Sequence, residues 1–88
     1  MIDQSMAHIH YFAWVREKVG VPEERLPLPP TVDRVDRLLD FLRGKGEPYA
    51  SVLLDPTLRV AVNRCHAQPQ DPLTDGDEIA IFPPISGG

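Results

Sequence analysis

The chain has a single cysteine, Cys65, and it lacks both an excess of basic charge and any long apolar run. One cysteine excludes an internal disulfide and fits a reducing compartment, so we expect a cytoplasmic protein. The sequence has 9 Lys and Arg residues and 13 Asp and Glu residues, so acidic residues are in excess. Proteins that bind nucleic acid carry basic patches instead. No segment approaches the length of a membrane span, and the first residues do not resemble a signal peptide. We therefore expect neither nucleic acid nor a membrane as a partner.

The length of 88 residues suits one domain with a modest core. Met6 is a plausible alternative start, so residues 1–6 are expected to form a disordered extension. The 10 prolines separate short elements and do not form a proline-rich tract. We expect the folded domain to span residues 7–83 and a flexible tail to span residues 84–88.

Four segments have the composition or the period of two that is typical of β-strands. In Ala7–Ala13, Ile9 and Tyr11 alternate with polar or aromatic neighbours. The other three predicted strands are Glu24–Leu28, Leu58–Asn63 and Glu78–Phe82. Between the last two, residues 73–77 (Leu-Thr-Asp-Gly-Asp) have the composition of a turn.

One long helix is predicted at Thr31–Arg43, with Thr31 as its N-cap. Its apolar residues recur at helical spacing and form one stripe: Val32, Val35, Leu38, Leu39 and Leu42. A shorter helix is predicted at Trp14–Val19, where Gly20 can end it in a left-handed conformation. The order of elements predicts a small α+β domain whose sheet is covered on one face.

Two phenylalanines are expected on the uncovered face. If Ile9, Tyr11, Ile79 and Ile81 face the helix, Phe12 and Phe82 must point away from it. Exposed aromatic side chains close together are typical of a docking surface. Loops folding over both rings would be the structural alternative.

The last two residues, Gly87 and Gly88, have no Cβ atoms and make a thin chain end. Such an end can enter a narrow channel in which another protein handles the terminal carboxylate. It can equally be a frayed terminus, since chain ends are often disordered.

Several motifs together resemble the MoaD/ThiS family of sulfur carriers, which includes the small subunit of molybdopterin synthase. The resemblance runs from about Ala7 to Gly88 and rests on Phe12–Gly20 (FAWVREKVG), Ala61–Asn63, Pro72–Ile79 and Phe82–Gly88 (FPPISGG). It implies a ubiquitin-like β-grasp fold, a mixed sheet with one long helix packed on one face and an extended C-terminal tail.

The resemblance also implies a function for the terminal carboxylate. A MoeB-like adenylating enzyme would use ATP and Mg²⁺ to convert the Gly88 carboxylate to an acyl-adenylate. Sulfur derived from a persulfide would then displace AMP and leave a thiocarboxylate. A MoaE-like large subunit, in a heterotetramer, would accept that sulfur for cyclic pyranopterin monophosphate in molybdenum cofactor biosynthesis. The chain would bind no cofactor and would not be catalytic alone.

The resemblance also implies roles for the residues of the tail and for those that would contact a partner. Gly87 would keep the tail thin, and Ser86 would be part of the tail, while Pro83 and Pro84 restrict φ and stiffen its exit from the sheet. Phe12 and Phe82 would contact the partner, with His66 and Ile85 beside them.

Alternatives of other classes remain open at this point. The chain could be a sulfur carrier for thiamine or cysteine synthesis, a ubiquitin-like protein modifier, or a binding module with an inert tail. His8 and His10 share a strand face and Cys65-His66 could lie nearby, but no paired motif at zinc-ligand spacing is present. We therefore expect no metal site.

Overall fold

The computed structural model describes residues 6–74 and 76–84. These residues form a sheet of five strands: β1 (Met6–Tyr11), β2 (Glu23–Pro27), β3 (Arg59–Val62), β4 (Cys65–Ala67) and β5 (Glu78–Phe82). The helices are α1 (Ala13–Val19), α2 (Val35–Arg43) and α3 (Tyr49–Val52). The predicted tail residues Ile85, Ser86, Gly87 and Gly88 lie outside the described residues.

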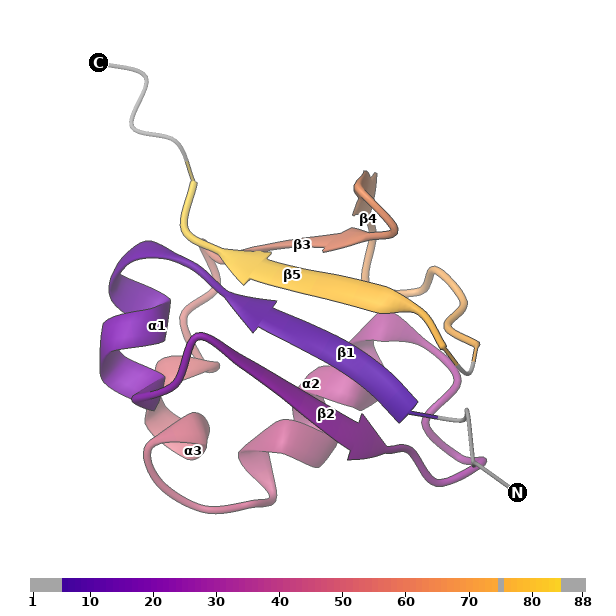
Figure 1. Cartoon of the computed structure of the whole chain (residues 1–88), viewed down its shortest axis with the longest axis horizontal. Helices are drawn as coiled ribbons and strands as arrows, with labels where there is room; N and C mark the ends of the chain where they lie inside the picture. Colours follow the sequence, from indigo (N-terminus) through magenta and orange to yellow (C-terminus); the bar gives the residue numbers. More distant parts are fainter. Residues whose placement is uncertain (1–5, 75, 85–88) are drawn as a thin grey trace.

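The strands follow the order β2-β1-β5-β3-β4 across the sheet (Figure 1). β1 and β5 are parallel, and the remaining neighbours are antiparallel, so the sheet is mixed. The parallel pair places the first and the last strand of the domain side by side at its centre. The predicted α+β architecture is confirmed.

Alternating side chains of the two central strands form the middle of the core. Ile9, Ile79 and Ile81 are fully buried, and Tyr11 is 1% exposed. Leu38 and Leu42 of α2 are also fully buried, and they belong to the same cluster. The side chains between the buried residues of the two central strands project from the other face of the sheet. In Figure 1, α2 and α3 lie behind the sheet, and no described helix lies in front of it.

The long helix begins at Val35 and not at Thr31, so the predicted start and N-cap were wrong. Arg34 occupies the N-cap position with extended dihedral angles and makes an isolated β-bridge with Pro72. Thr31 lies in a turn that the Val32 N–H closes on the Pro29 carbonyl at 2.9 Å. Val32 still packs against the core, which explains why it fits the helical stripe without being helical.

Other boundaries differ by one or two residues. β1 begins at Met6, which pairs with Pro27, and it ends at Tyr11, because Ala13 adopts a positive φ of 55° and starts α1. Gly20 ends α1 in the predicted left-handed conformation, at φ 98°, and it donates its N–H to the Arg16 carbonyl at 2.9 Å. The short helix α3 was not predicted. None of the helices in the described ranges has the length and apolar character that crossing a membrane requires.

Candidate docking face

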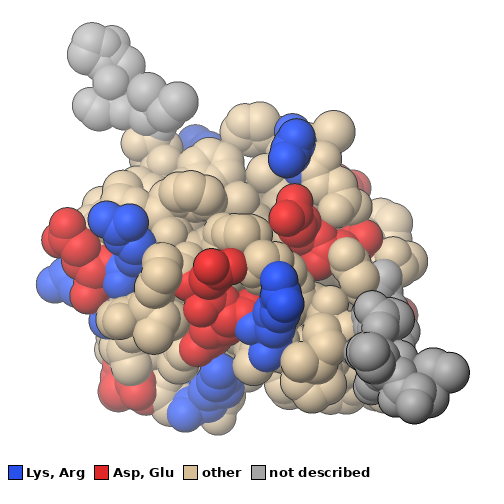
Figure 2. Space-filling model, viewed as in Figure 1, with Lys and Arg blue, Asp and Glu red and all other residues tan. Residues whose placement is uncertain are grey.

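The side of the sheet that the helices leave uncovered is called here the open face. Its side chains from β1, β5, β3 and β4, with the residue after β1, include His8, His10, Phe12, Glu78, Ala80, Phe82, Ala61 and His66. They alternate with the buried residues of the same strands. Seen from this side, uncharged surface covers the ends of β1 and β5, with acidic and basic side chains around it (Figure 2).

The two predicted aromatic residues lie on adjacent strand ends of the open face. The Phe12 N–H donates to the Ile81 carbonyl at 3.1 Å, which continues the β1–β5 pairing by one residue. The Phe12 side chain is 49% exposed, and that of Phe82 is half-buried. No loop within residues 6–74 and 76–84 covers Phe12, so among these residues the alternative of a covering loop does not hold for this ring.

A histidine lies beside each phenylalanine. The His66 ring meets the Phe82 ring edge-on, with centroids 5.7 Å apart, and the His10 ring lies 6.3 Å from the Phe12 ring. His66 pairs with Ala61 across β3 and β4, which explains why it shares a face with Phe82. The structure therefore brings Phe12, Phe82 and His66 onto one surface, whereas Ile85 lies outside the described residues.

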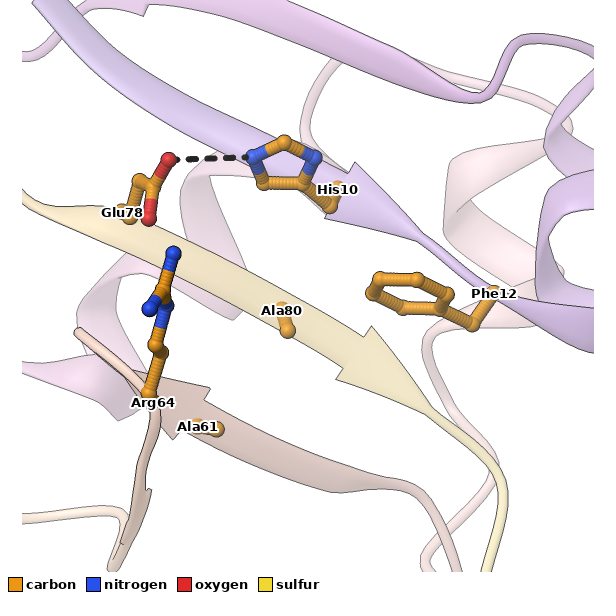
Figure 3. A pocket seen from close by; sticks show the side chains of 6 residues that line it. All are labelled: His10, Phe12, Ala61, Arg64, Glu78 and Ala80. Atoms are coloured by element: carbon orange, nitrogen blue, oxygen red, sulfur yellow. Dashed lines mark ion pairs between the residues drawn. The ribbon is translucent and has the colours of Figure 1, made fainter.

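A shallow hollow of about 240 Å³ lies next to Phe12 (Figure 3). Its floor is low because Ala61 and Ala80, which pair across β3 and β5, carry only methyl groups. Its remaining lining residues are His10, Phe12, Arg64 and Glu78. The hollow combines an aromatic ring with charged groups, which suits a partner side chain that is partly apolar and partly polar.

Two histidines and two glutamates gather at the end of the hollow away from Phe12. Glu78 Oε2 lies 3.7 Å from His10 Nε2 and 4.0 Å from His8 Nδ1. His8 Nε2 is hydrogen-bonded to Glu23 Oε1. This hydrogen bond is the main reason why the pKa of Glu23 lies below its usual range.

Sequence reasoning missed Arg64, although it lines the hollow and its side chain extends toward Glu78 (Figure 3). Asn63 and Arg64 both adopt positive φ, 51° and 72°, in the two-residue turn between β3 and β4. Such values are typical of the central positions of a type I′ turn, where glycine is usual at the second position. The only signal in the sequence was the asparagine, which tolerates this conformation.

Asn63 also explains why two of the sequence motifs occur together. Its side-chain amide donates to Asp77 Oδ1 at 3.0 Å, and its Oδ1 accepts the Glu78 N–H at 3.0 Å. Asp77 in turn closes the predicted turn by accepting the Thr74 N–H at 2.9 Å. The turn thus sets where β5 begins, and so which residues of β5 reach the open face.

β5 leads directly from the open face to the chain end. It ends at Phe82, and Pro83 and Pro84 follow outside the strand, as the missing N–H of proline requires. Pro83 alone therefore separates Phe82, the last open-face residue of β5, from the predicted tail that starts at Pro84.

Comparison with known proteins agrees with this geometry. The model of the ThiS family matches residues 9–88. The molybdopterin synthase sulfur carrier subunit of Escherichia coli is 38% identical over 84 residues, which cover 94% of this chain and 100% of that protein.

Solved structures show the same fold. A putative molybdopterin converting factor subunit 1 from Pyrococcus furiosus is similar with a TM-score of 0.72 at 30% identity, over 91% of this chain and 98% of that one. A chain in the complex of subunits 1 and 2 of the molybdopterin-converting factor from Helicobacter pylori matches with a TM-score of 0.63 at 20% identity, over 94% and 99% of the two chains. The predicted ubiquitin-like β-grasp fold is confirmed, and the chain belongs to the ThiS family.

Proposed function

We propose that this chain is the sulfur carrier subunit of a molybdopterin synthase. The observation that carries the proposal is the direct continuity between β5, which presents Phe82 on the open face, and the final residues of the chain. The family match extending to residue 88 and the resemblance to curated sulfur carriers support it.

The reacting group is the carboxylate of Gly88. A carboxylate is a poor electrophile, so it must first be activated. Attack of the carboxylate on the α-phosphate of ATP forms an acyl-adenylate and releases pyrophosphate. Sulfide-level sulfur from a persulfide, with a thiol as reductant, then attacks the acyl carbon and displaces AMP. The product is a thiocarboxylate, whose sulfur is a far better nucleophile than the original oxygen.

This chain's own part in the reaction is to present that group. ATP and Mg²⁺ are proposed to bind the MoeB-like adenylating enzyme and not this chain. The exposed thiol of Cys65 is compatible with a reducing cytoplasm, which we propose as the compartment.

The open face is proposed to dock on a MoaE-like large subunit. In Helicobacter pylori, a protein with this fold forms a complex with subunit 2 of its molybdopterin-converting factor. On this chain, Phe12, Phe82 and His66 offer an aromatic surface next to the exit of the tail. Docking there would direct Gly88 into the partner, which supplies the substrate site and the general acid and base groups.

The test is incubation of the chain with its cognate adenylating enzyme, ATP, Mg²⁺ and a persulfide donor, followed by intact mass spectrometry. We expect the mass gain of one oxygen replaced by one sulfur, located on the C-terminal peptide. Omission of ATP should prevent it. A Gly88 deletion should keep the fold, because residue 88 lies beyond the last strand, yet gain no sulfur.

Two results would contradict the proposal. One is an unchanged mass in the complete mixture with an adenylating enzyme that forms AMP on a known carrier. The other is an amide link between Gly88 and lysine side chains without a thiocarboxylate, which would indicate a protein modifier.

A further inference from the structure

Three potential metal ligands meet on the open face at the start of β5. His8 and His10 are two residues apart on β1, so their side chains project to the same side. Glu78 is the partner of His8 in the parallel β1–β5 register. Each of the three side chains brings one ligand atom within 4.8 Å of the other two.

The spacing of these atoms is close to that of a coordination sphere. Ligand atoms of a tetrahedral Zn²⁺, with bonds of about 2.0–2.2 Å, stand about 3.4 Å apart. Glu78 Oε2 lies 3.7 Å from His10 Nε2 and 4.0 Å from His8 Nδ1. Side-chain rotations that move each atom by less than 1 Å would close the difference, and the sheet backbone need not change.

A fourth side chain orients the first histidine. Glu23 is the register partner of His10 on β2, and its Oε1 is hydrogen-bonded to His8 Nε2. An ionised carboxylate can only accept, so His8 Nε2 carries the proton of this hydrogen bond, and in the neutral ring the lone pair that a metal needs is on Nδ1, 4.0 Å from Glu78 Oε2. A carboxylate behind a histidine in this way is the usual outer partner of a metal-bound imidazole.

We propose that His8 Nδ1, His10 Nε2 and Glu78 Oε2 form a binding site for one divalent cation of the Zn²⁺ class, with Glu23 as the outer partner of His8. Two imidazoles and one carboxylate are ligands that zinc accepts, and three protein ligands leave one position for water or a partner group. His8 and His10 are half-buried, so the cation would lie in the surface of the sheet and not on a loop.

Within residues 6–74 and 76–84, the group of three ligands contains no fourth residue. Among the described residues, Cys65 and His66 do not belong to the ligand group, because β3 and β5 separate β4 from β1. Arg64 lines the same hollow, and its side chain extends toward Glu78 (Figure 3). Because Glu78 and His10 also line the hollow beside Phe12, a bound cation would stand on the open face itself.

The test is titration of the full chain, free of partners, with ZnCl₂ by isothermal calorimetry. We expect one site per chain and a dissociation constant in the micromolar range or below. His10→Gln and Glu78→Gln, on different strands, should each weaken binding at least tenfold, as loss of one of three ligands requires. His66→Gln and Cys65→Ser are the matched controls and should leave the constant unchanged within about twofold.

Glu23→Gln tests the role of the outer partner. Its amide leaves the three ligands in place but no longer fixes the tautomer of His8, so affinity should fall about tenfold. Absence of one-to-one binding by the unaltered chain would overturn the site. So would equal losses in His10→Gln and His66→Gln, or loss of binding in Cys65→Ser. Melting temperatures without metal verify that each variant is folded, and a rise on adding ZnCl₂ should be absent from His10→Gln.

Discussion

The carboxylate of Glu24, on the edge strand β2, accepts hydrogen bonds from the hydroxyl groups of both tyrosines in the chain. Tyr11 donates to Oε1 at 3.1 Å, and Tyr49 donates to Oε2. Lys45 Nζ lies 3.4 Å from Oε1. These contacts tie β1 and α3 to the edge of the sheet, and they keep the two phenols neutral because a phenolate would face a carboxylate.

Alkaline titration of the two tyrosines tests this arrangement at the scale of single residues. Burial and the neighbouring Glu24 raise the pKa of Tyr49 to about 12 and that of Tyr11 further. A raised pKa favours the protonated form in the folded chain. The stability contributed is complete below the ordinary value of 10.0 and is lost as the pH rises through the folded value. The ultraviolet absorbance of phenolate should therefore stay low at pH 10 and rise only above about 11.

Tyr49→Phe is the control for that titration. It should remove the component near pH 12 and leave only the later one, which accompanies unfolding. Half-titration of either phenol at pH 10 in the folded chain would contradict the role given to Glu24.

At the scale of elements, the turn between β3 and β4 combines an unfavourable conformation with a side chain on the open face. Arg64 holds φ 72°, a region that costs non-glycine residues about 1–2 kcal/mol. Conformations of this kind persist at sites where the side chain is needed. The Arg64 side chain lines the hollow, so we infer that its place on the open face is the reason for the unfavourable conformation.

Arg64→Gly should therefore stabilise the isolated chain while weakening the open face. Glycine adopts the left-handed conformation without strain, but it loses more backbone entropy on folding. The difference between these two effects predicts a gain of about 0.5–1 kcal/mol in the free energy of unfolding. Denaturant unfolding measures it. Affinity for the large subunit should fall in the same variant.

Asn63→Ala, at the other position of the same turn, should destabilise the chain. It removes the bonds to Asp77 and to the Glu78 N–H, and it keeps a non-glycine residue at φ 51°. It should lower the free energy of unfolding by about 1–3 kcal/mol. A stability loss in Arg64→Gly equal to that in Asn63→Ala would refute the strain argument.

The elements that sequence reasoning located correctly are those whose period reports burial directly. Ile9 and Tyr11, like Ile79 and Ile81, alternate in the sequence because one face of each strand is buried. The helix start was misplaced because Val32 is apolar for packing and not for helicity, and the bridge between Arg34 and Pro72 is a tertiary contact. Local patterns do not encode such contacts.

The open face was predictable only in part for a related reason. Phe12 and Phe82 could be placed on it from alternation alone, and the structure agrees. The neighbours of His10 depend on the register between β1 and β5, which the sequence does not state. For this reason the cluster with Glu78, and the hollow above Ala61 and Ala80, became visible only in three dimensions.

At the scale of the whole molecule, one sheet serves two surfaces, a core that holds the fold and a face that we propose for docking. Phe82→Ala should weaken binding of the large subunit about 30-fold or more, the loss of about 2 kcal/mol that truncating an aromatic anchor typically causes. Phe12→Ala should act in the same direction. Calorimetric titration of the large subunit with each variant measures both.

Leu54→Ala is the matched control, since Leu54 is a large apolar residue that is 67% exposed and follows α3, away from the open face. It should leave the affinity unchanged. Equal weakening by Leu54→Ala and Phe82→Ala would mean that the partner does not use the open face.

The central claim is that Gly88 delivers sulfur from a chain docked by its open face. The most direct test is a single turnover of the thiocarboxylated chain with the large subunit and cyclic pyranopterin monophosphate, followed by intact mass spectrometry. We predict that the chain returns to the mass of its carboxylate form as the pterin gains sulfur, and that Phe82→Ala slows this return at limiting large subunit. A thiocarboxylate that persists in the complete mixture, with the large subunit bound, would contradict the account.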